Sequence, residues 1–263
     1  MKNQNRGSVL RLFGAVVFAL ALNGCDGLDV EQQAPDQCVA PEGMELTTIQ
    51  STVDWINAME KPLTLPCFLR SLPRPLNVNT STVQISAQPG SKRSPRVFFI
   101  FNDQLVLTVT TDQNRDANKE IDLPAELEEH LLEISFMLKD ENGEYLTEGD
   151  SDILTVKAEL YFPVTGILKD SAPYEDILFG EDKAQTVCLF CHFNESIHDY
   201  VDGVPVFKSD IRRLTKVASL YEMRILNNEC DPQAEPHRCN MLSSILDHGL
   251  LQWQFFPEKP RRN

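Results

Sequence analysis

The clearest pattern along the chain is a strict alternation of apolar and polar positions over residues 154–162. The order is Leu154, Thr155, Val156, Lys157, Ala158, Glu159, Leu160, Tyr161 and Phe162. Successive side chains of a strand point to opposite faces, so this pattern predicts an antiparallel strand with one face in water. Other strand-like runs are Leu65–Leu69, Thr82–Ala87, Arg96–Phe101, Leu105–Thr110 and Leu131–Leu138. Short strands separated by turns, such as Asp140–Gly143, predict an Ig-like antiparallel β-sandwich domain over residues 46–172.

Helical periodicity marks both ends of this region. Ile49, Val53, Ile56 and Met59 share one helical face within Thr47–Met59. After Pro173, helices are predicted over Asp176–Val187, Ser209–Leu226 and Pro236–His248, with Ser209 as an N-cap and Gly249 as a C-cap. We therefore expect an α+β protein in which a small, mostly helical domain over residues 173–263 follows the sandwich.

The first residues combine positive charge with a short apolar run. Lys2, Arg6 and Arg11 precede eleven apolar residues that end at Leu22. That run is too short for a transmembrane helix, which needs about 20 residues, and it is typical of a secretory signal. It leads into Leu22-Asn-Gly-Cys25, which resembles the lipobox of bacterial lipoprotein precursors.

The lipobox resemblance implies a signal peptide over residues 1–24 and a diacylglycerol on Cys25. A polar tether over residues 25–45 would then connect the lipid to the folded chain on the periplasmic side of the cell envelope. Asp26 resembles the inner-membrane retention signal of some bacteria, although the choice of membrane stays open. The alternative is a plain cleaved signal in which Cys25 is an ordinary cysteine.

Composition and charge restrict the partners. The formal net charge is −15, and it becomes −18 when the three basic residues of the signal are removed. This acidic balance disfavours nucleic acid and leaves membrane attachment to the lipid. A hydrophobic content of 42% is enough for a packed core. The acidic segment Glu126–His130 is predicted to be solvated.

Six cysteines follow Cys25, and an even number in an oxidising compartment indicates disulfides. Cys38 and Cys67 are predicted to pair and to pin the tether or the first helix to the sandwich. Cys230 and Cys239 flank a loop with two prolines and are predicted to form a second disulfide.

The strongest chemical motif is Cys188-Leu-Phe-Cys191-His192, which resembles the haem attachment motif of c-type cytochromes. The resemblance implies haem c bonded to Cys188 and Cys191, with His192 as the proximal ligand of the haem iron. The second ligand would come from a downstream side chain, the choices being Met223, Met241, His198, His237 and His248.

Other uses of this motif stay open. Cys188 and Cys191 can pair with each other, or with Cys230 and Cys239 as staples between helices. The same four thiols also suit a tetrahedral zinc site. A thioredoxin-type redox pair would require a βαβ setting, which the flanking sequence does not predict.

Two functions follow from these patterns. The first is a membrane-anchored electron-transfer protein with a mono-haem domain and a redox partner. The second is a non-enzymatic structural or partner-binding lipoprotein of the envelope whose cysteines form disulfides. The chain contains no hydrolase, kinase or dinucleotide-binding motif.

Overall fold

The computed structural model describes residues 38–83, 91–111, 130–147, 153–180, 183–190, 192, 194–211 and 217–256. These residues belong to one compact unit, Gln32–Asn263. The predicted signal peptide, Cys25, the first part of the tether and Cys191 lie outside the described residues. Within the described ranges, no helix has the length and apolar character needed to cross a membrane.

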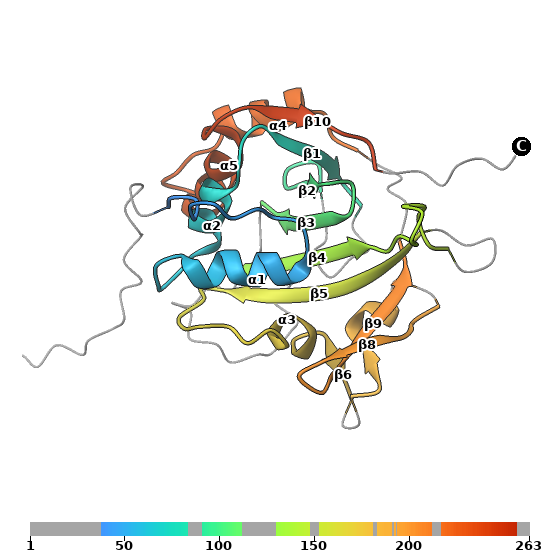
Figure 1. Ribbon diagram of the computed structural model, residues 1–263. Coiled ribbons are helices and arrows are strands. Elements are labelled where there is room, and N and C mark those ends of the chain that lie inside the picture. The colour runs from blue at the N-terminus through green and yellow to red at the C-terminus, as the bar shows by residue number, and fades with distance from the viewer. Residues whose placement is uncertain are drawn as a thin grey trace, which may run out of the picture. The chain divides into compact units, whose positions relative to one another are not determined.

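One large sheet organises the unit (Figure 1). It has eight strands in the order β10-β1-β2-β3-β4-β5-β9-β8, and all neighbours are antiparallel except β1 and β10. The strands are β1 (Leu76–Ser81), β2 (Arg96–Phe101), β3 (Leu105–Thr110), β4 (His130–Met137), β5 (Leu154–Phe162), β8 (Ser196–Val201), β9 (Val204–Asp210) and β10 (Leu251–Trp253). A separate two-stranded sheet contains β6 (Leu178–Phe179) and β7 (Gln185–Thr186), and the 3-10 turn η2 (Val187–Phe190) follows it.

Helices cover one face of the large sheet. They are α1 (Ile49–Ala58), α2 (Leu65–Ser71), α3 (Ala172–Glu175), α4 (Leu220–Asn228) and α5 (Pro236–Leu246). Trp55, Phe68, Met223 and Met241 bring α1, α2, α4 and α5 into a core with strand residues such as Leu160. Burying these apolar side chains is the main stabilising contribution to the unit.

The expected division into a sandwich and a helical domain is replaced by a single unit. Strands β9 and β8 follow residue 172, yet they extend the same sheet at β5, and β10 pairs with β1 at the opposite edge. The described strands form one large sheet and the small β6–β7 sheet, so the Ig-like sandwich is not found among them. These pairings join residues far apart in the chain, which local periodicity does not reveal.

Three of the predicted strands have the expected bounds. Arg96–Phe101, Leu105–Thr110 and Leu154–Phe162 are β2, β3 and β5, and the turn at 140–143 is present. The run Leu65–Leu69 is helical instead, because Thr64 caps the Cys67 N–H and Pro66 occupies the first turn of α2.

The helices predicted after residue 173 are corrected in two places. Ser209 lies in β9 and not at an N-cap, and α4 begins after Ser219, whose side chain forms a capping box with Glu222. The expected helix Asp176–Val187 is instead β6, β7 and the start of η2. The last predicted helix is present as α5.

The second face of β5 is not in water, contrary to the expectation from its alternation. Lys157 and Glu159 are only 8% and 5% exposed. Because β9 pairs with Leu154–Val156 alone, the rest of β5 extends past β9. Cys188 in the η2 turn is close enough to Lys157 to act on its ionisation. A buried face that carries ionisable groups has an electrostatic cost, so it is the first place to look for function.

Candidate functional site

A cluster of charged side chains occupies the second face of the sheet. Glu133 on β4 lies directly opposite Glu159 on β5, and Ser135 lies opposite Lys157 in the next row of that face. Arg96 reaches the cluster from β2. Alternation along each strand places these side chains on the face opposite the apolar core.

Two contacts within the cluster hold its charges in place. Arg96 forms an ion pair with Glu133, and its guanidinium also lies over the Phe98 ring at 5.2 Å from the centroid. The Lys157 ammonium donates a hydrogen bond to the Ser135 hydroxyl at 3.1 Å. Buried ions are tolerated only when they are paired or hydrogen-bonded, and both contacts meet that condition.

Burial changes the ionisation of Lys157. Loss of hydration lowers its pKa to about 8, although the Glu133 carboxylate, and Cys188 when it is ionised, favour the charged form. A lysine with this pKa exchanges its proton close to neutral pH. It is therefore able to act as a proton acceptor, which ordinary surface lysines are not.

Cys188 lies beside this cluster. It follows β7 in the η2 turn, and its backbone N–H donates to the Thr186 hydroxyl at 3.1 Å. Thr186 is held in turn by Glu195, which accepts from its N–H at 2.9 Å and from its hydroxyl at 2.5 Å. The Cys188 thiol is free, and burial together with the Glu159 charge raises its pKa to about 12. It is protonated at neutral pH.

His192 closes one helical turn with Cys188. The His192 N–H donates to the Cys188 carbonyl oxygen at 2.8 Å, and its ring Nδ1 lies 2.8 Å from the Asp210 carbonyl oxygen on β9. The first and fifth positions of the motif thus lie one turn apart, and backbone contacts orient the imidazole. Cys191 lies outside the described residues.

These surroundings fit a porphyrin poorly. A haem needs an apolar slot, whereas the Cys188 thiol is close enough to Lys157 and Glu159 for both charges to act on its pKa. Met223 and Met241 are buried in the core with the helices and are occupied there as packing residues. These charged groups argue against the haem that the resemblance implies, and the haem site stays a prediction.

The remaining histidines lie in other parts of the unit. His198 is exposed on β8, and His248 is exposed after α5. His130 and His237 interact with each other electrostatically, and burial lowers the pKa of His130 to about 4. His130 was expected to be solvated, but it begins β4 opposite Phe162 and is largely buried there.

The structure contains both disulfides that the sequence predicts. Cys38 is bonded to Cys67, so the segment before α1 is attached to α2, and Cys230 is bonded to Cys239. Because Cys230 and Cys239 are bonded to each other, the predicted zinc site with Cys188 and Cys191 is wrong. A disulfide staple from Cys188 or Cys191 to either of these two cysteines is wrong for the same reason. No group of three or more His, Cys, Asp and Glu side chains among the described residues is arranged to hold a metal ion.

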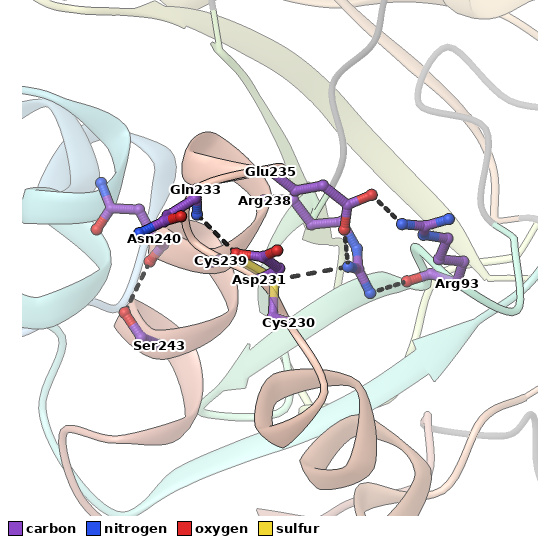
Figure 2. Close-up of a disulfide and its surroundings, with 9 residues drawn as sticks. All are labelled: Arg93, Cys230, Asp231, Gln233, Glu235, Arg238, Cys239, Asn240 and Ser243. Atoms are coloured by element: carbon purple, nitrogen blue, oxygen red, sulfur yellow. Dashed lines mark hydrogen bonds and ion pairs between the residues drawn. A yellow bond between two sulfur atoms is a disulfide. The ribbon is translucent and has the colours of Figure 1, made fainter.

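The Cys230–Cys239 disulfide positions a buried arginine (Figure 2). Arg238 donates to the Glu235 carboxylate at 2.6 Å, to the Cys230 sulfur at 3.5 Å and to the Arg93 carbonyl oxygen at 3.1 Å. Arg93 also forms an ion pair with Glu235. The disulfide loop thereby holds α5 to the segment that precedes β2.

Comparison with known proteins yields no match. No protein-family model fits the chain, and no curated protein or solved structure matches it. The function must accordingly be argued from the residues of this chain.

Sequence reasoning missed Arg96, Glu133, Lys157 and Glu159 as candidate site residues. In the sequence, Lys157 and Glu159 stand at the polar positions of an alternating strand, where a charge ordinarily faces water. Lys157 and Glu159 differ from surface residues only because other parts of the chain pack over them. The motif at Cys188 was found, and the structure adds the charged groups that surround its first cysteine.

Proposed function

We propose that this chain is a lipid-anchored protein of the cell envelope that acts by binding a protein partner. The lipid on Cys25 holds it at the membrane, and the compact unit presents a binding strand on the periplasmic side. The observation that carries the proposal is the outer edge of the large sheet, at β8.

Strand β8 is the last strand of the sheet order and is exposed along almost its whole length. Ile197 and Tyr200 are 48% and 59% exposed, which is unusual for large apolar side chains in a strand. An edge strand presents backbone donors and acceptors that an extended peptide can pair with, and its side chains then supply specificity.

The occupant that suits β8 is an extended partner segment with apolar and basic residues. Asp199 and Asp202 are exposed at the strand and its turn, and the whole chain is acidic. Lysine or proline residues commonly protect an edge strand from such pairing, and β8 contains neither. A bulge between Ile197 and Asp199 limits the pairing to one part of the strand.

Site-specific crosslinking tests the partner surface. In cells that produce the full chain, one variant carries a photoreactive residue in place of Tyr200. A control variant carries the same residue in place of Leu250, which is 70% exposed on a different part of the unit. We expect one discrete adduct from position 200, and we expect Ile197→Lys to abolish it. An equal adduct from position 250, or an adduct that persists in the Ile197→Lys protein, overturns the β8 proposal.

The anchor is tested separately. Metabolic labelling with an alkyne fatty acid should mark the wild-type protein and leave a Cys25→Ala protein unlabelled. The Cys25→Ala protein should also leave the membrane fraction. Equal membrane retention of both proteins contradicts lipid attachment at this position.

The electron-transfer alternative is decided by a spectrum. A protein produced in a host with haem-maturation machinery should show no Soret band and no covalently bound haem after denaturation. A haem-stained band that disappears in a Cys188→Ala, Cys191→Ala double variant would replace the partner-binding proposal with the haem protein.

A further inference from the structure

We propose that one edge of the large sheet docks on the anionic phospholipid surface of the membrane to which the lipid anchor holds the chain. This surface, the β10 edge, is made by five apolar residues on and beside β10 and at the start of α4, namely Leu250, Trp253, Phe255, Val217 and Tyr221. The inference rests on the proposed function in one respect, the lipid on Cys25. It assigns a role to a surface that partner binding through β8 does not use.

The first argument is the exposure of large apolar side chains at this edge. Leu250, Tyr221 and Phe255 are 70%, 73% and 79% exposed, and Val217 is exposed beside them in sequence. Trp253 is half-buried, and its ring meets the Phe255 ring edge-on with 6.4 Å between the centroids. A group of exposed apolar side chains on a compact unit marks a surface that binds a protein or a membrane.

The second argument is that two segments far apart in sequence are brought to the same strand. The Gln254 N–H donates to the Val78 carbonyl oxygen at 2.9 Å, just after β10 ends. The Ala218 N–H donates to the Thr80 hydroxyl at 2.9 Å, two residues further along β1. The chain that leads into α4 therefore continues along β1 where β10 stops, and Tyr221 lies at the same end of the edge as Phe255.

The side chains of this edge suit lipid better than an extended peptide. Strand β10 has three residues, so it gives a peptide little backbone to pair with, whereas β8 has six. Tryptophan and tyrosine rings are enriched at the boundary between membrane and water, where the headgroups lie. Leucine and phenylalanine side chains enter the apolar layer just below that boundary. The β10 edge presents both kinds of side chain together.

Basic residues accompany the apolar ones, although the chain as a whole has a net charge of −15. Arg224 is exposed on α4 one turn after Tyr221, and the intervening Glu222 is held by the Ser219 cap. In the sequence, the seven residues after Phe256 include three basic residues and one acidic residue, namely Lys259, Arg261, Arg262 and Glu258. Positive charge beside exposed apolar side chains favours an anionic headgroup surface.

The anchor brings the β10 edge within reach of the membrane. Cys25 precedes Cys38 by thirteen positions, a length of chain that spans about 45 Å at most. Cys38 is bonded to Cys67 on α2, and only residues 72–75 separate α2 from β1, whose Leu76 pairs with Leu251 of β10. In Figure 1, β10 and β8 lie at opposite ends of the sheet, so docking at β10 leaves β8 free for its partner. A short tether also makes a weak surface contact effective.

Quenching of tryptophan fluorescence by brominated lipid is the primary test, because bromine on an acyl chain quenches a ring that enters the membrane. The chain has two tryptophans, Trp55 in the core and Trp253 on the β10 edge. The lipidated full chain is placed in phosphatidylcholine vesicles, and in vesicles that also contain anionic phosphatidylglycerol, with ordinary or brominated acyl chains. We expect brominated lipid to reduce the emission, more strongly in the anionic vesicles, and to have no effect on a Trp253→Phe protein.

Matched variants test which surface makes the contact. Phe255→Asp and Tyr221→Asp place a charge on the β10 edge, so each should reduce the bromine-dependent loss of emission by roughly half or more. The control is Ile167→Asp, which changes a 76% exposed residue between β5 and α3 and should keep the wild-type loss. Because all three side chains are exposed, the urea midpoints of the variants should equal that of the wild type, which verifies that they are folded.

Four results overturn the inference. The first is equal emission in ordinary and brominated vesicles, and the second is an equal loss in the Phe255→Asp, Tyr221→Asp and Ile167→Asp proteins. The third is an equal loss in neutral and anionic vesicles, which would exclude the anionic headgroup as the ligand. The fourth is a discrete protein adduct from the photoreactive residue at position 250, which would mean that a protein covers this edge.

Failure of this inference differs from failure of the proposed function. A chain that carries no lipid on Cys25 contradicts the proposed anchor, and the fatty-acid labelling shows it. A lipidated chain that stays in the vesicles without bromine quenching contradicts docking at the β10 edge alone.

Discussion

The Lys157 side chain on β5 donates a 3.1 Å hydrogen bond to the Ser135 hydroxyl on β4, across a face of the sheet that is closed to water at Lys157. The two residues are direct partners in the strand register. Their contact shows that the polar positions of β5 belong to the interior, where each charge changes the ionisation of its neighbours.

The reactivity of the Cys188 thiol should be very low in the folded protein. Its pKa is raised from 9.0 to about 12, so the reactive thiolate is depleted about a thousandfold relative to the unfolded chain. The measurement is the rate of iodoacetamide alkylation at pH 8 in a Cys191→Ala protein, native and in denaturant. Glu159→Gln should raise the native rate, and a native rate equal to the denatured one would contradict the burial of this thiol.

The stability of the fold should fall in acid because of His130. Burial and nearby His237 lower its pKa from 6.5 to about 4, so the folded state favours the neutral ring. The contribution of the neutral His130 ring to the free energy of unfolding is complete above pH 6.5. It declines as the pH falls toward 4 and is lost below that pH, with a total change of about 3 kcal/mol. Urea unfolding at several pH values measures it. His130→Leu should remove much of the slope between pH 6.5 and 4, whereas a change at exposed His198 should keep it.

Loss of the Cys230–Cys239 disulfide should destabilise the unit. The bonded residues are nine apart in sequence, and closing a ring of this size contributes about 3 kcal/mol through the unfolded chain. A Cys230→Ala, Cys239→Ala protein should therefore unfold at a lower urea concentration. The single exchange Ser243→Ala on the same helix serves as the control, and equal midpoints for both proteins would be evidence against the loop model.

Replacing Arg238 should lower the free energy of unfolding more than replacing its partner Arg93. The Arg238 guanidinium is buried among Glu235, the Cys230 sulfur and the Arg93 carbonyl oxygen, whereas the Arg93 side chain is largely exposed. Arg238→Met leaves a half-buried carboxylate and a carbonyl oxygen without this donor, which costs about 2 kcal/mol or more. Arg93→Met should cost less than about 1 kcal/mol, as is usual for an exposed ion pair. Thermal or urea unfolding of both variants checks the order.

The sequence predicted some elements of the fold correctly and others wrongly. The apolar runs 96–101 and 105–110 and the alternation in 154–162 predicted the bounds of β2, β3 and β5, because residue composition and period-two patterning are local properties of a strand. The loop between Cys230 and Cys239 likewise predicted its own disulfide. The helix expected at Ser209 failed because β-sheet pairing with β5 overrode the apolar periodicity of that segment.

The sequence by itself determined the local features of this protein, namely the basic and apolar start that leads to Cys25, the spacing of Cys188 and Cys191, and the alternation along β5. The tertiary structure decided that both faces of β5 are buried, since that depends on the chain that packs over it. It also placed Arg96, Glu133, Lys157 and Glu159, from strands far apart in sequence, on one buried face. Strand register brings such residues together, and burial then makes their charges interact strongly because water no longer screens them.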